Sequence, residues 1–146
     1  MSDGVGRGPQ VALAYGPSVT LAEADGIVAA ARAEAERVGW PMVIAVVDAA
    51  GMLVALARMD QAQLGSIEVA RHKAETAARF RRPTRAFEAG IAAGGIGLRA
   101  LSMDVSAIDG GLPLVRDDKV IGAIGVSGML PTEDAQVALA GAAALG

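Results

Sequence analysis

PMVIAVVDAAGMLVALARM, residues 41–59, consists of two apolar runs separated by a short Ala-Ala-Gly turn. The first run, 41–49, contains no polar residue except Asp48, and such a run is typical of a strand that is buried on both faces of a sheet. The second run, 52–59, has the length and composition of a return strand. The stretch therefore predicts a β-hairpin whose first strand is central in a sheet.

A long helix is predicted immediately before the hairpin, over residues 18–39. Its apolar residues recur at helical spacing. Thr20 and Glu23 have the spacing of a capping box, in which two side chains accept hydrogen bonds from the first backbone N–H groups of a helix. Gly39 is a typical C-terminal stop, so both ends of this helix are predicted by local signals.

Further helices are predicted after the hairpin. One extends from Gly65 to Phe80 and ends before Pro83, because a residue that precedes proline avoids the helical conformation. A short helix is expected around 84–90. The last helix occupies the C-terminus, with Thr132 as its predicted N-cap.

The remaining segments contain glycine-rich turns and strands. A glycine-rich loop at 92–97 precedes a strand that is favoured near 102–107. Two more strands are predicted in DGGLPLV (109–115) and VIGAIGVSG (120–128). The order is then helix, two strands, helix, three strands, helix. It contains hairpins rather than β-α-β units, so we expect an α+β fold with an antiparallel sheet covered by helices.

The composition excludes several classes of protein. The 146 residues suffice for one domain, assigned to 11–146, which follows a flexible tail at 1–10. The absence of cysteine excludes disulfides and thiolate catalysis and agrees with a cytoplasmic location. A net charge of −3 disfavours nucleic acid as a partner, and no apolar run is long enough for a membrane helix. One histidine without cysteine cannot build an ordinary zinc site, so no metal ligands are predicted.

The helical segment IEVARHKAETAARF, 67–80, contains the only histidine of the chain and a lysine beside it. Each helical residue turns by about 100°, so Lys73 falls inside the apolar arc and His72 on its polar boundary. Lys73 is therefore predicted to project toward the sheet. His72 is predicted to face solvent or another subunit.

A lysine on an apolar face needs a counter-charge, a path to water or an anionic ligand. One interpretation is structural: Lys73 reaches the edge of the sheet or forms an ion pair. The other is functional, with Lys73 as an anion anchor, a base or a nucleophile, and Asp48 as its partner. Asp48 also has a structural interpretation, as a turn residue that accepts hydrogen bonds from backbone N–H groups.

Further candidate ligand-binding residues lie at strand ends and in glycine-rich loops. Two lie at the end of the return strand, and one begins the next helix, where an N-cap is the simplest function. The others lie in loops whose N–H groups can bind an anion. Tight turns are the leading alternative for the loop glycines. With the buried lysine, the predicted ligand-binding set is Arg58, Asp60, Ser66, Lys73, Gly110, Gly111 and Ser127.

Two long segments resemble the GlcG/HbpS family, also called DUF336 or haem-degrading proteins. The first contains PMVIAVVDAAGMLVALARM, KAETAARF and RRPT, and the second is GGLPLVRDDKVIGAIGVSG with the C-terminal helix. The resemblance covers nearly everything from residue 18 onward. It implies a profilin-like α/β/α arrangement with a five-stranded antiparallel sheet, and assembly into a homo-oligomer.

The resemblance also implies candidate ligands. Some members of the family bind haem, and others belong to catabolic operons for small acids, diols or aromatic compounds. Haem is therefore a candidate cofactor, and His72 is its candidate axial ligand.

Three functions remain open from the sequence. The first hypothesis is a small-ligand-binding protein of the GlcG/HbpS type, which holds an anionic or tetrapyrrole ligand between the second helix and the glycine-rich loops. The second is a cofactor-poor catabolic lyase, isomerase or hydrolase acting on a small carboxylate or carbonyl compound, with Lys73 and Asp48 as catalytic residues. The third is an accessory structural subunit.

Overall fold

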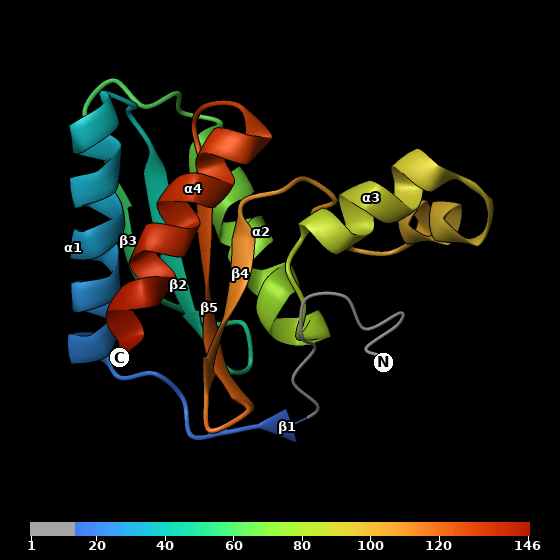
Figure 1. The fold of residues 1–146 in the computed structure, drawn as a ribbon, viewed down its shortest axis with the longest axis horizontal. Helices are drawn as coiled ribbons and strands as arrows, with labels where there is room; N and C mark the ends of the chain where they lie inside the picture. Colours follow the sequence, from blue (N-terminus) through green and yellow to red (C-terminus); the bar gives the residue numbers. More distant parts are fainter. Residues whose placement is uncertain (1–13) are drawn as a thin grey trace.

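The computed structural model describes residues 14–146, which form three layers (Figure 1). A five-stranded sheet is covered on one face by α1 (Leu21–Val38) and α4 (Pro131–Ala142) and on the other by α2 (Ser66–Phe80). A short 3₁₀ helix, η2 (Ala143–Leu145), follows α4. The predicted flexible tail at 1–10 lies outside the described residues.

The sheet is built around its longest strand, β5. This strand pairs antiparallel with β2 and β4, and β2 pairs antiparallel with β3, which confirms the predicted hairpin. The short β1 pairs parallel with the start of β5, so the sheet is mostly but not entirely antiparallel. The predicted α+β fold with a five-stranded sheet is confirmed, with strands β1 (Ala14–Tyr15), β2 (Val43–Asp48), β3 (Leu53–Arg58), β4 (Gly111–Arg116) and β5 (Lys119–Ser127).

Two hydrophobic cores lie on the two faces of the sheet. Side chains alternate along β2, so Ile44 and Val46 pack beneath α1 and α4, whereas Val43, Ala45 and Val47 pack beneath α2. All five side chains are fully buried. The apolar run that begins at residue 41 is thus explained by burial on both faces, as expected for a central strand.

The helix ends confirm some of the predicted caps and correct others. Thr20 caps α1 in a capping box with Glu23, and the helix ends at Gly39 in a left-handed conformation, as predicted. Thr132 is not an N-cap, because α4 already begins at Pro131, whose fixed φ suits a first helical position. No helix in the described part of the chain is long and apolar enough to cross a bilayer.

The segment between α2 and β4 is the largest departure from the predicted order. Instead of a strand near 102–107, α3 (Arg85–Ala93) and the 3₁₀ helix η1 (Gly95–Ser102) pack on each other and project from the body of the molecule (Figure 1). We call this projection, residues 85–102, the arm. Its two helices touch at Gly97, where a Cβ would lie 2.1 Å from the Gly90 carbonyl oxygen. The strand prediction is wrong, because η1 extends to Ser102 and residues 103–107 have no regular secondary structure.

Candidate functional site

The helix α2 lies unusually close to β5. Its buried face consists of small residues, among them Ala70 and Ala74, and it faces Gly125 of the strand. A Cβ on Gly125 would lie 2.0 Å from the Ala70 carbonyl oxygen, so any side chain there would displace the helix. This contact places Lys73, which lies between Ala70 and Ala74 on α2, directly over the end of β5.

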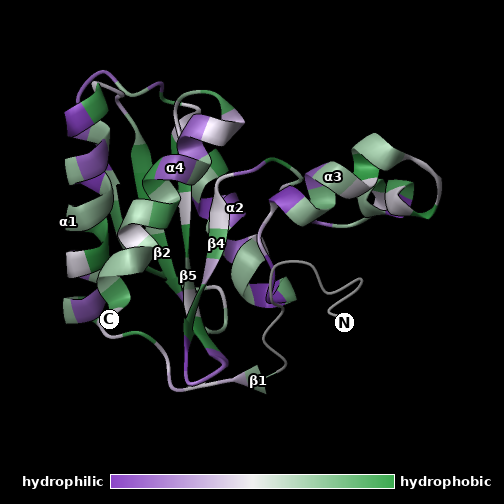
Figure 2. Ribbon diagram, viewed as in Figure 1, coloured by the Kyte–Doolittle hydropathy of each residue, from purple (hydrophilic) through white to green (hydrophobic). Residues whose placement is uncertain are grey.

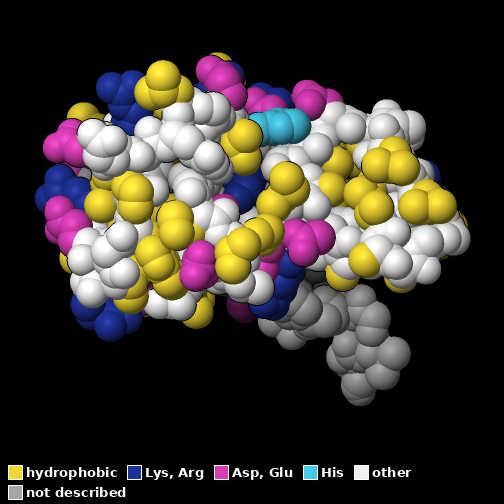
Figure 3. Space-filling view, turned by 90° about the horizontal axis from the view of Figure 1, so that it is seen from above, with side chains coloured by type: hydrophobic (Ala, Val, Ile, Leu, Met, Phe, Trp, Pro, Cys, Tyr) yellow, Lys and Arg dark blue, Asp and Glu magenta, His cyan; other side chains and the backbone are white. Residues whose placement is uncertain are grey.

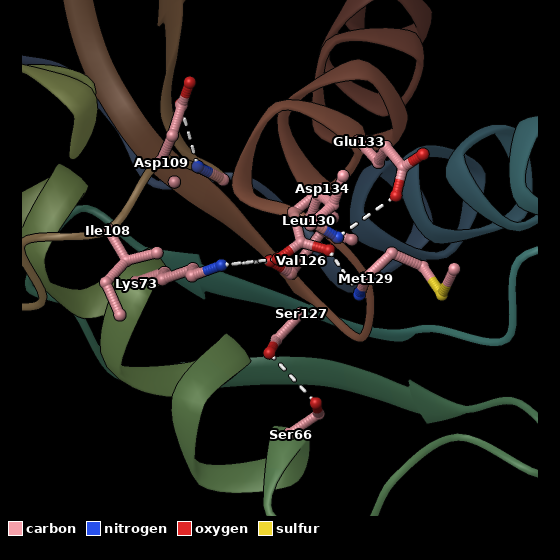
Figure 4. A network of polar contacts seen from close by, with 12 residues as sticks. Ser66, Lys73, Ile108, Asp109, Val126, Ser127, Met129, Leu130, Glu133 and Asp134 are labelled. Carbon is pink, nitrogen blue, oxygen red and sulfur yellow. Dashed lines mark hydrogen bonds and ion pairs between the residues drawn. The ribbon is translucent and has the colours of Figure 1, made fainter.

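Lys73 crosses the end of the sheet and binds one group of β5 and one group of α4, the helix on the opposite face (Figure 4). Its Nζ donates hydrogen bonds to the Val126 carbonyl oxygen at 2.9 Å and to Asp134 Oδ2 at 2.8 Å. Asp134 belongs to the first turn of α4. The side chains of Lys73 and Asp134 are only 1% and 3% exposed, so the pair is desolvated and joins the two helical layers.

The glycines of the DGGLP stretch make room for this lysine. A Cβ on Gly110 would lie 2.8 Å from Lys73 Nζ and 2.7 Å from the Val126 carbonyl oxygen. Gly110 also has a φ of +127°, which side chains rarely adopt. A Cβ on Gly111 would lie 2.5 Å from the Lys73 carbonyl oxygen. Both glycines are therefore required by close packing around Lys73.

The electrostatic environment of Asp134 combines burial with several donors. Burial raises the pKa of the Asp134 carboxyl, because the charged form is poorly solvated, whereas Lys73 and the N–H groups of Met129 and Gly128 favour the charged form. The Met129 N–H donates to Asp134 Oδ1 at 2.9 Å. Both oxygens of the Asp134 carboxylate thus accept hydrogen bonds from within the protein.

These contacts confirm one prediction about Lys73 and correct another. The lysine projects toward the sheet, as its helical phase predicted. Its partner is Asp134 and not Asp48, whose Oδ1 instead accepts hydrogen bonds from the N–H groups of Ala50 and Met52 at the β2–β3 turn. Ligand-binding or catalytic functions of Lys73 and Asp48 stay predictions.

Ser66 and Ser127 meet beside the lysine, as the sequence reasoning grouped them (Figure 4). The Ser127 hydroxyl donates to Ser66 Oγ at 3.0 Å, and both residues are buried. Ser66 is the first residue of α2 and not its N-cap, because Gly65 occupies that position. The structure thus brings Ser66, Lys73, Gly110, Gly111 and Ser127 together in one buried polar cluster.

Arg58 and Asp60 lie elsewhere, in a groove between α1 and the end of β3. The groove has a volume of about 370 Å³, and Arg32 and Glu36 of α1 also line it. Within residues 14–146, the side chains of Arg32 and Arg58 form no ion pair or hydrogen bond. The predicted ligand-binding set is therefore split between two places in the fold.

A larger groove, of about 560 Å³, lies between α2 and residues 104–108. The groove wall is partly apolar and partly charged. Residues 104–108 have no regular secondary structure, but two hydrogen bonds fix their position. The Ser106 N–H donates to Thr76 Oγ1, and Thr84 Oγ1 donates to the Ile108 carbonyl oxygen. The lining residues are Glu68, Val69, Arg71, His72, Glu75, Asp104, Val105, Ser106, Ala107 and Ile108.

His72 lies in this groove and on the surface, where the single histidine is cyan in Figure 3. Its Nε2 is 2.9 Å from Asp104 Oδ1. The His72 side chain is 36% exposed and that of Asp104 is 86% exposed, so this contact is open to water. The predicted position on the polar boundary of α2 is confirmed, although residues 104–108 cover part of that boundary.

The sequence did not reveal the acidic partners of Lys73 and His72. Asp134 is 61 residues from Lys73, and Asp104 is 32 residues from His72. An acidic residue in the first turn of a helix, as Asp134 is, was a visible signal, but it pointed to the helix N-terminus rather than to Lys73. Asp104 lies where a strand was predicted, and no local signal marks it.

The chain was compared with known protein families. The model of the haem degrading protein HbpS-like family matches residues 19–143, which include the sheet from β2 onward and all four α-helices. The chain belongs to the HbpS-like family. The predicted resemblance is therefore confirmed.

Relatives and solved structures agree with this assignment. The protein GlcG from Escherichia coli K12 is 40% identical over 104 residues, which are 71% of this HbpS-like chain and 77% of GlcG. The crystal structure of HbpS has a TM-score of 0.82 and 32% identity, covering 92% of this chain and 94% of HbpS. The crystal structure of a PduOC:haem complex has a TM-score of 0.79 and 29% identity, with coverage of 87% and 94%.

Proposed function

We propose that this HbpS-like protein binds haem in the groove along α2, with His72 as the axial ligand. The observation that carries the proposal is the position of the only histidine in the larger groove of about 560 Å³. Its family is described as haem-degrading, and one of its structural relatives was crystallised with haem. At a coarser level, these relatives support a small-ligand-binding function for the chain.

The residues of the groove fit a haem. Val69, Val105 and Ile108 contribute apolar surface for a porphyrin face. Arg71, half exposed on the same wall, is suited to a propionate because a guanidinium binds a carboxylate through two N–H groups. A bound haem would supply a redox-active iron.

His72 is free to exchange its partner. Its present contact with Asp104 is exposed, and exposed ion pairs contribute only about 0–1 kcal/mol. Rotation of the Asp104 side chain into water would therefore free Nε2 for iron at little cost. A fully buried histidine would not have this freedom.

A haem titration followed by absorption spectroscopy tests the proposal. We expect a shifted Soret band in the wild-type protein and the loss of that shift in His72→Ala. Glu68→Gln is the matched control, because Glu68 lines the same groove and carries no axial ligand atom. A wild-type protein without a Soret shift, or an unchanged spectrum in His72→Ala, contradicts the assignment.

The Arg32–Arg58 groove supports a second ligand class, a small carboxylate. Two guanidinium groups that lack a counter-ion within the described residues line one groove of about 370 Å³. Arginine binds carboxylates through paired hydrogen bonds. We expect malonate, as a probe, to raise the Tm of the wild type and not that of Arg58→Gln. Arg37→Gln is the control, because Arg37 is already paired with Glu34. Equal Tm shifts in all three proteins contradict this site.

The arm supports a homo-oligomer, with a second copy of the chain covering its apolar side chains. Ile96 and Leu101 of η1 are 74% and 70% exposed. The arm is mostly pale green and white in Figure 2, with purple at the start of α3, and hydrophobic side chains gather on it in Figure 3. Exposed apolar clusters of this kind are typical of protein contacts. Light scattering after size exclusion should show a smaller assembly for Ile96→Asp/Leu101→Asp than for the wild type. A monomeric wild-type protein contradicts the proposal.

A further inference from the structure

We infer that His72, Glu75 and Asp104 form a binding site for a divalent transition-metal cation. Each residue offers one ligand atom, and these atoms lie within 4.8 Å of one another. The set consists of one imidazole nitrogen and two carboxylate oxygens. Counting histidine and cysteine alone could not reveal it, because two of the three ligands are acidic.

The separation of the ligand atoms suits a metal ion. Nitrogen and oxygen ligands lie about 2.0–2.2 Å from such an ion, which places neighbouring ligand atoms about 3 Å apart. His72 Nε2 and Asp104 Oδ1 are already 2.9 Å apart. The Glu75 carboxylate needs only a side-chain rotation to join them, because it starts within 4.8 Å.

The backbone holds the three residues in place before any ion binds. His72 and Glu75 are three residues apart on α2, so a rigid helix presents them on one face. Asp104 belongs to the irregular segment, but Ser106 two residues later is fixed to α2 by a 2.9 Å hydrogen bond to Thr76 Oγ1. Thr76 directly follows Glu75, so the anchor lies beside the site.

The surrounding charges leave the site net negative. Arg71 is paired with Glu68, and Arg79 is 3.4 Å from Glu75 Oε1, which leaves the second oxygen of Glu75 for a cation. A cation would replace the contact between His72 Nε2 and Asp104 Oδ1. The neutral imidazole would then bind through Nε2 and keep its proton on Nδ1.

The donor set selects the class of ion. One nitrogen with two carboxylate oxygens favours Mn²⁺, Fe²⁺, Co²⁺ or Zn²⁺, whereas Mg²⁺ and Ca²⁺ prefer oxygen ligands alone. Three protein ligands leave further coordination positions open. Those positions face the groove, so a bound ion would remain accessible to water or to a small ligand.

The site goes beyond haem binding and competes with it. Both functions use His72 Nε2, and one nitrogen cannot bind a haem iron and a second cation at once. Glu75 and Asp104 belong only to the cation site. Their substitution therefore separates the two functions, which His72→Ala cannot do.

Cobalt titration of the haem-free protein tests the inference. We expect visible d–d absorption bands on addition of Co²⁺, and excess Zn²⁺ but not Mg²⁺ should abolish them. Asp104→Asn and Glu75→Gln should each weaken Co²⁺ binding by at least about 10–100-fold, because loss of a residue that only supports a metal ligand already costs that much. The same variants should keep the Soret shift of the wild type, if haem binds.

Asp25→Asn is the control, since Asp25 is an exposed carboxylate on α1, outside the groove and the cluster. Its Co²⁺ affinity should equal that of the wild type. The inference is overturned by the absence of d–d bands in the wild type, or by an equal loss of affinity in Asp25→Asn. Either result leaves the haem proposal intact, because the Soret titration is measured separately.

Discussion

Two neighbouring residues of α2 belong to contrasting parts of the molecule. Lys73 contacts Asp134 at 2.8 Å in the buried polar cluster, and His72 contacts Asp104 at 2.9 Å in the open groove. The contact distances are nearly equal, but only the first pair is removed from water. Burial, rather than contact distance, therefore decides whether a contact between two polar side chains is structural or remains available to a ligand.

The largest effect is expected on breaking the buried pair. Asp134→Ala leaves the Lys73 ammonium buried without a counter-charge, and such changes destabilise proteins by about 3–5 kcal/mol. Urea denaturation should show this as a lower transition midpoint. The matched change in the groove, Asp104→Ala, should change the free energy of unfolding by about 0.5 kcal/mol or less, because the pair is exposed.

The two variants together test whether burial distinguishes the two contacts. Similar free energies of unfolding for Asp134→Ala and Asp104→Ala would mean that Lys73 reaches water when Asp134 is absent. The distinction between a closed cluster and an open groove would then be wrong.

An intermediate effect is expected when both members of the buried pair become apolar. Lys73→Met/Asp134→Leu removes the two charges and leaves neither uncompensated, so its loss of stability should be smaller than that of Asp134→Ala alone. Urea denaturation of the single and double variants measures the difference. A double variant at least as unstable as Asp134→Ala would show that the ion pair itself is strongly stabilising.

The smallest effect concerns Asp109, which lies between the two environments. Burial raises the pKa of the Asp109 carboxyl above its ordinary 3.8, and the Glu88 carboxylate adds to this, while the Gly110 N–H and the Arg85 charge oppose it. A raised pKa in the folded state gives a stabilising contribution that is present below 3.8 and is lost as the pH rises through the folded value.

Asp109→Asn tests this sign. The variant should gain stability relative to the wild type as the pH rises from about 3 to 7, because only the wild type acquires a partly buried charge. Urea denaturation at several pH values measures the trend. A difference that stays flat, or falls, with rising pH would place Asp109 with the exposed carboxylates.

Much of the fold could be predicted because local signals were strong. The two apolar runs around residues 49–51 predicted the hairpin, and Thr20 with Glu23 predicted the start of α1. The short helix expected around 84–90 is present as α3, but η1 and its packing on α3 could not be predicted, since no local feature marks them. Ser66 and Thr132 were wrong as N-caps because α2 begins one residue, and α4 two residues, earlier than the cap signal suggested.

For the candidate site, helical phase alone determined that Lys73 points inward and His72 lies on a polar boundary. It also indicated that Lys73 needs a counter-charge, a path to water or an anionic ligand, because a charged group is costly to bury. Only the tertiary structure decided that Asp134 supplies that charge and that Asp104 and Glu75 meet His72. The reason is physical: helical periodicity is local, whereas these partners are brought together by the close packing of α2 on β5 and by the return of residues 104–108 along the helix.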